Sequence, residues 1–68
     1  MDDELVFING THIETVLDAL WHESDIEEWD VFIKSLDDNI SKVRYVNWTT
    51  FITFKNEAYK SWFILRLS

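Results

Sequence analysis

The 68-residue chain contains no cysteine and no proline, and Gly10 is its one glycine. Without cysteine no disulfide can stabilise a small core, and a zinc site built from thiolates is excluded. A glycine-rich loop of the kind that cradles phosphates is excluded as well, because it needs several glycines. With so few turn residues, we expect tightly joined elements in a single domain over residues 1–68.

A basic N-terminus and a long apolar run are also missing. The chain opens with the acidic sequence Met1-Asp2-Asp3-Glu4, whereas a secretory signal begins with positive charge followed by an apolar stretch. No apolar run approaches the roughly 20 residues that a membrane span requires. We therefore expect a cytoplasmic protein with no membrane partner.

Aromatic side chains compensate for the small size. A chain this short buries only about 60% of the surface that its unfolded form exposes. Hydrophobic residues make up 47% of the chain and aromatic residues 16%, including four tryptophans. Because each aromatic side chain buries about 150–250 Å², a sufficient core is expected from these residues. Oligomerisation is the other common remedy for a small core.

Two segments have the pattern of amphipathic helices. Thr11-His12-Ile13-Glu14 has the form of a capping box and predicts the start of the first helix. Ser24-Asp25-Ile26-Glu27 has the same form and predicts the start of the second. The apolar stripes recur at helical spacing. They comprise Ile13, Val16, Leu17, Leu20 and Trp21 in the first helix, and Ile26, Trp29, Phe32, Ile33 and Leu36 in the second.

The remaining segments favour strands. Glu4 to Ile8 predicts a short strand, and Val43 to Phe54 predicts two more, divided by a bend near Asn47 to Thr49. Tyr59 to Leu67 predicts a last strand, although a helix over residues 57–66 also fits its apolar pattern. The predicted fold is therefore α+β, in the order β-α-α-β-β-β, with two helices on one face of a small antiparallel sheet.

Charge is divided unevenly along the chain. Residues 1–38 contain twelve acids and one base, a net charge of −11. Residues 39–68 contain five bases and one acid, a net charge of +4, which brings the total to −7. Such asymmetry is informative about partners, although surface acids also serve solubility and the basic half can balance the acidic half within the fold.

A functional acidic face is the more specific interpretation. It would repel nucleic acid and would attract a larger protein, or a protein–nucleic acid complex, with a basic surface. In size, charge and aromatic content the chain is similar to phage-encoded anti-restriction and anti-CRISPR inhibitors, which occupy nucleic-acid sites. This resemblance implies an inhibitor or modulator of a nucleic-acid-handling partner. The predicted contact residues are Glu14, Asp18, Glu27, Glu28, Asp30, Asp37 and Asp38.

The sequence offers little for catalysis or cofactor binding. Asp18 and His22 have the spacing of two metal ligands on a helix, but a stable site needs three or four ligands and no third is evident. His12 is interpreted as a surface residue. Paired carboxylates act as acid and base only in a cleft that separates their pKa values, and 68 residues leave little material for one. We therefore expect a protein that is not an enzyme and has no cofactor.

The aromatic residues of the C-terminal half support two further hypotheses. A strand over residues 59–67 would have apolar side chains on both faces, which predicts a homodimer or assembly subunit that self-associates through its sheet. The predicted residues are Trp48, Tyr59, Trp62 and Phe63. Bases and aromatics on the same sheet can also bind single-stranded nucleic acid, although the net charge opposes that use.

Overall fold

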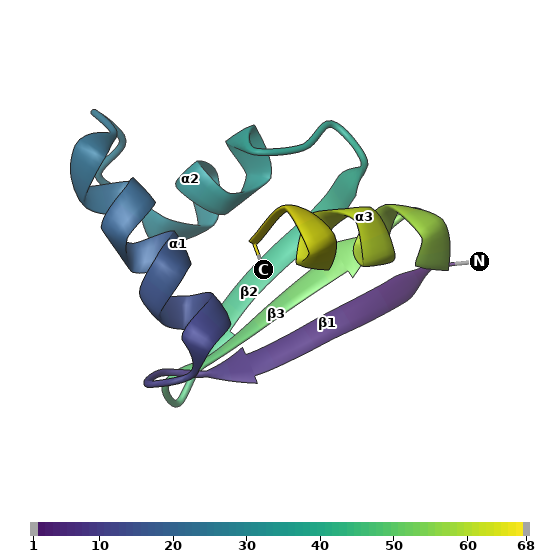
Figure 1. Cartoon of the computed structure of the whole chain (residues 1–68), viewed down its shortest axis with the longest axis horizontal. Helices are drawn as coiled ribbons and strands as arrows, with labels where there is room; N and C mark the ends of the chain where they lie inside the picture. The colour runs from purple at the N-terminus through teal and green to yellow at the C-terminus, as the bar shows by residue number, and fades with distance from the viewer. Residues whose placement is uncertain (1, 68) are drawn as a thin grey trace.

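The structure, a computed structural model, describes residues 2–67 and has an α+β fold, which confirms the predicted class (Figure 1). The chain forms three strands, which make one sheet, and three helices. In order, they are β1 (Asp3–Ile8), α1 (His12–Glu23), α2 (Trp29–Ser35), β2 (Ile40–Val46), β3 (Thr49–Phe54) and α3 (Glu57–Leu67).

The sheet is antiparallel, with the strand order β1-β3-β2. Its register pairs Leu5 of β1 with Ile52 of β3, and Ile52 in turn with Val43 of β2. Because side chains alternate along a strand, these three residues share one face of the sheet. On the central strand the same face carries Thr50 and Phe54, both fully buried.

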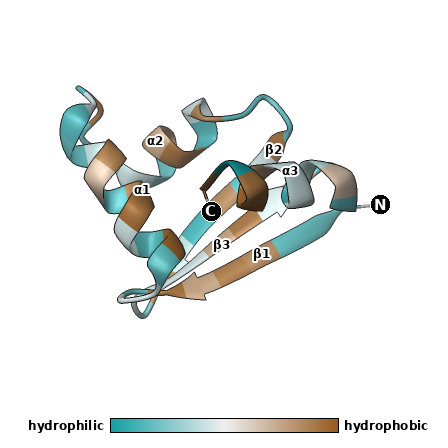
Figure 2. Ribbon diagram, in the orientation of Figure 1, coloured by the Kyte–Doolittle hydropathy of each residue, from teal (hydrophilic) through white to brown (hydrophobic). Residues whose placement is uncertain are grey.

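All three helices lie on that one face of the sheet (Figure 1), as was predicted for the first two. Hydrophobic residues recur along the three strands and in the three helices (Figure 2). The buried hydrophobic residues form one cluster between the two layers. They are Leu5, Phe7, Leu17, Phe32, Ile33, Ile40, Ile52, Phe54 and Phe63. No helix within residues 2–67 has the length and apolarity needed to cross a membrane.

The predicted bend between the second and third strands is confirmed as a two-residue turn. Asn47 and Trp48 have φ angles of 51° and 63°, the left-handed values that a two-residue hairpin turn of type I′ requires. Asparagine tolerates this conformation, but tryptophan adopts it at a steric cost. The strained residue is at the tip of the hairpin, where the Trp48 side chain is 71% exposed.

The first predicted capping box is confirmed, with one change. The Glu14 amide donates to Thr11 Oγ1 at 3.4 Å, as expected, while the Glu14 carboxylate accepts from the Gly10 amide at 2.9 Å. Both contacts hold the first turn of α1 against the end of β1 and fix the Glu14 side chain in place.

The second predicted capping box is wrong. Ser24 instead ends α1, because its amide and hydroxyl both donate to the Trp21 carbonyl, at 3.1 and 2.8 Å. The indole Nε1 of Trp21 then donates to the Ile26 carbonyl at 2.8 Å, which holds residues 24–28 outside either helix. The second helix therefore begins at Trp29 rather than beside Ser24.

The predicted last strand is also wrong, and the alternative helix is observed as α3. Asn56 Oδ1 accepts a hydrogen bond from the Tyr59 amide at 3.2 Å, which is the contact of a helix N-cap. Tyr59, Phe63 and Leu67, spaced four residues apart, pack toward the core. A strand would instead have grouped Phe63 with Leu65, which is exposed here.

Candidate functional site

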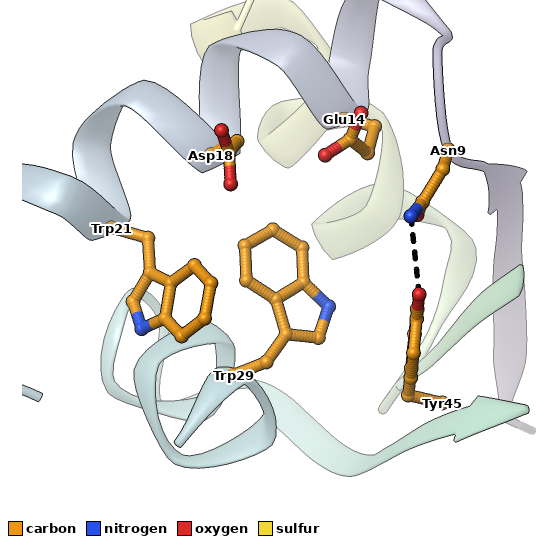
Figure 3. Close-up of a pocket in the computed structure, with 6 residues that line it drawn as sticks. All are labelled: Asn9, Glu14, Asp18, Trp21, Trp29 and Tyr45. Carbon is orange, nitrogen blue, oxygen red and sulfur yellow. Dashed lines mark hydrogen bonds between the residues drawn. The ribbon is translucent and has the colours of Figure 1, made fainter. Parts of the chain in front are cut away.

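A pocket of about 160 Å³ lies between α1, the start of α2 and strand β2 (Figure 3). We call it the acidic aromatic pocket, because two carboxylates and three aromatic rings line it. Its lining residues are Asn9, Glu14, Asp18, Trp21, Trp29 and Tyr45.

The two tryptophans form the aromatic floor of the pocket. Trp21 and Trp29 meet edge to face, with ring centroids 5.2 Å apart and an interplanar angle of 71°. Both indole N–H groups are used within the protein, since Trp21 donates to the Ile26 carbonyl and Trp29 donates to Thr50 Oγ1 at 3.2 Å. These bonds fix the two rings and leave carbon surface, rather than N–H donors, to line the pocket.

Tyr45 and Asn9 close the opposite side. The Asn9 amide Nδ2 donates to the Tyr45 hydroxyl oxygen at 3.1 Å (Figure 3). The Asn9 backbone amide also donates to the Trp48 carbonyl at 2.8 Å. The turn after β1 is thereby tied to the β2–β3 hairpin, which positions Tyr45 beside the start of α1.

The carboxylates of Glu14 and Asp18 lie on the α1 side of the pocket and are drawn beyond the edge of the Trp29 ring in Figure 3. The two residues are four apart on α1, so their side chains occupy the same helix face. Asp18 has His22 Nδ1 at 3.6 Å, in an exposed pair. Among residues 2–67, the ion pairs made by lysine and arginine join Lys60 to Asp3 and Arg66 to Asp37. No lysine or arginine of the described chain therefore neutralises the pocket.

Three further predicted contact residues are neighbours of lining residues, Glu27 through a shared hollow, and Glu28 and Asp30 in the sequence. Glu27 lines a shallower hollow that shares Trp21 with the acidic aromatic pocket. Glu28 and Asp30 are exposed and flank Trp29 in the sequence, at the N-terminal end of α2. Besides Glu14 and Asp18 on α1, the predicted acids thus occupy the loop after α1 and the first turn of α2.

The remaining two acids lie at the other end of α2. The Asp37 carboxylate accepts from the backbone and side chain of Asn39, at 2.9 and 3.1 Å, and from Arg66 at 3.4 Å. Asp37 is thus engaged in holding the α2–β2 connection and α3, whereas Asp38 is exposed beside it. Because the seven residues of α2 span about 10 Å, this end is separate from the pocket.

The four predicted self-association residues do not share a sheet face. Phe63 is 1% exposed and Tyr59 packs against the core, both on α3, while Trp62 on the same helix is 66% exposed. Trp48 is at the hairpin tip.

The sheet face opposite the helices carries a different apolar group. Val6, Ile8 and Val46 are exposed there, and Phe51 lies under the guanidinium of Arg44, 4.4 Å from ring centroid to Cζ. An apolar sheet surface therefore exists, but residues of β1, β2 and β3 form it.

Sequence patterns alone did not identify the aromatic half of the pocket. Trp21 and Trp29 both fall on predicted core stripes, and both do contact the core. Asn9 and Tyr45 are 36 residues apart, and only the sheet register brings them together. The visible signal was the acidic pair Glu14 and Asp18 on one helix face.

The described residues contain no metal-binding constellation, since no group of three or more histidine, aspartate or glutamate side chains gathers within residues 2–67. Comparisons of the chain with protein-family models, with curated proteins and with solved structures found no match.

Proposed function

We propose that this chain is a small acidic protein-binding module that docks on a larger partner through the surface around the acidic aromatic pocket. The observation that carries the proposal is the pairing of the Glu14 and Asp18 carboxylates, which lack a lysine or arginine partner, with the rings of Trp21, Trp29 and Tyr45.

The charge distribution favours a basic partner. Residues 1–38 carry a net charge of −11, and a field of this sign accelerates encounter with a positive surface at low ionic strength. Tryptophan and tyrosine are enriched among the residues that dominate binding energy at interfaces. The acids would steer the encounter and the rings would supply the buried contact.

A partner that handles nucleic acid fits this chemistry best. Surfaces that bind the phosphate backbone are lined with lysine and arginine. An acidic protein that occupies such a surface excludes the nucleic acid, so the proposed action is inhibition or modulation.

Affinity capture at two salt concentrations tests the proposal. The immobilised protein is incubated with nuclease-treated lysate of its native host at low and at high salt, and retained proteins are identified by mass spectrometry. We expect a nucleic-acid-handling protein that is retained at low salt and lost at high salt, because salt screens exposed charges. Retention of the chain alone at both salt concentrations would contradict the proposal.

A second candidate function, self-association as an assembly subunit, is favoured by the open sheet face. Val6, Ile8 and Val46 are exposed there beside the exposed Trp48. Contact through these apolar side chains would be insensitive to salt. Sedimentation equilibrium across a concentration series tests it, since a constant monomer mass at the highest concentration would exclude this candidate.

A further inference from the structure

We infer that the acidic aromatic pocket receives a single arginine side chain of the partner. The inference rests on the proposed function and specifies the chemistry by which its site would recognise a basic surface. Three properties of the pocket point to arginine: its size, its charge and the carbon surface that its two indole rings offer.

The size of the pocket suits one side chain. A volume of about 160 Å³ is close to that of an apolar cavity of about 150 Å³ that holds one benzene molecule. A guanidinium group with part of its aliphatic stem is of comparable size. The pocket therefore provides a socket for one residue within a larger contact surface.

The charge of the pocket excludes anions and favours a cation. Glu14 and Asp18 project into the same space from adjacent turns of α1 (Figure 3). The hydrogen bond from the Gly10 amide to Glu14 Oε1 at 2.9 Å holds one carboxylate in position before any ligand arrives. A preformed acceptor reduces the entropy lost on binding.

The rings distinguish arginine from lysine. The indole N–H groups of Trp21 and Trp29 are engaged with Ile26 and Thr50, so the rings offer their carbon surface to a ligand. A planar guanidinium stacks on such a surface while its N–H groups donate to carboxylates. The lysine ammonium is more strongly hydrated and cannot stack, so it gains less from the same walls.

An NMR titration of the whole protein with N-acetyl-arginine amide tests the inference. We expect saturable shifts of the Trp21 and Trp29 indole N–H resonances, with a millimolar Kd typical of one side chain. The citrulline analogue, similar in shape but uncharged, and the lysine analogue, equal in charge, should each bind at least tenfold more weakly.

Charge-removing variants locate the binding. Glu14→Gln combined with Asp18→Asn keeps the side-chain shapes and should weaken binding of the arginine probe at least tenfold. Glu4→Gln combined with Glu57→Gln removes the same charge from exposed positions on β1 and α3 and should leave the Kd within twofold. Dispersed spectra of both variants establish that each remains folded.

The inference is overturned if the arginine probe causes no saturable indole shift, or if citrulline or lysine binds as tightly. It is also overturned if both double variants weaken binding of the arginine probe equally, because the probe would then be attracted to the total charge of the protein rather than to the pocket. A negative titration combined with salt-sensitive capture of a basic partner would leave the proposed function standing without the arginine socket. A positive titration without such capture would refute the proposed function alone.

Discussion

Truncation of Phe63 compared with truncation of Leu65 provides the sharpest test of the C-terminal helix. Phe63 is 1% exposed and packs against Phe54, with ring centroids 5.3 Å apart, whereas Leu65 is 68% exposed. In a helix, residues two apart point in different directions, but in a strand they share a face. Only the helix therefore predicts a large loss of stability for Phe63→Ala and little change for Leu65→Ala.

The expected magnitudes differ by several kcal/mol. Removing a buried phenylalanine costs about 3–5 kcal/mol through lost burial and the cavity left behind. At roughly 0.05–0.15 kcal/mol per residue, the whole chain has about 3–10 kcal/mol of stability, so Phe63→Ala should be marginally folded or unfolded at 25 °C. Leu65→Ala should change the free energy of unfolding by no more than about 0.5 kcal/mol.

Urea denaturation followed by circular dichroism measures both variants against the parent protein. If Leu65→Ala destabilises the protein as much as Phe63→Ala, the two residues share a buried face and the assignment of α3 is refuted. A Phe63→Ala variant as stable as the parent would contradict the position of this ring in the core.

Three further predictions concern the turn, the cap and the floor of the pocket. Thr50→Val should cost about 1–2 kcal/mol and shift the Trp29 indole N–H resonance, because it removes the buried acceptor 3.2 Å from that donor; an unchanged urea midpoint would contradict this role. Trp48→Gly should be more stable than Trp48→Ala by about 1 kcal/mol, because glycine relieves the left-handed strain; equal thermal midpoints would show that no strain is stored there. Glu14→Ala should cost about 0.5–1 kcal/mol more than Glu14→Gln, which can still accept from the Gly10 amide; equal losses in urea would refute the capping role.

Local signals predicted the elements that local contacts stabilise. The cap at Thr11 and the apolar stripe of α1 were evident in the sequence, and both depend on residues close together in the chain. The strand β1 was evident from its residue types, although its hydrogen-bonding partner is the distant strand β3. The bend near Asn47 to Thr49 was also predicted, and asparagine at position 47 suits the left-handed turn observed there.

Contacts beyond the local pattern decided the elements that the sequence misassigned. Ser24 has the same cap chemistry whether it begins a helix or ends one, and the Trp21 indole bond to Ile26 selects the second role. The segment after Asn56 is rich in aromatic and β-branched residues, so its propensity favoured a strand. Tertiary packing of Tyr59 and Phe63 onto the helix-covered face overrides that propensity.

Only the acidic part of the candidate site was predicted from the sequence, for a related reason. Acidic residues on an exposed helix face stand out in a sequence, and Glu14 and Asp18 were predicted as contact residues on that basis. Tryptophans in an apolar stripe are indistinguishable from ordinary core residues, although Trp21 and Trp29 are also partly exposed and line a pocket. The pairing of Asn9 with Tyr45 needed the strand register, which sequence patterns did not specify.

The docking surface itself is tested most directly by capture with matched variants. The parent chain, the Glu14→Gln and Asp18→Asn double variant, and the Glu4→Gln and Glu57→Gln double variant are immobilised at equal density in nuclease-treated host lysate. At low salt, we expect the parent and the β1–α3 variant to retain the same basic partner, and the pocket variant to retain at least tenfold less of it. Equal retention by all three proteins, or equal loss in both variants, would contradict docking through the acidic aromatic pocket.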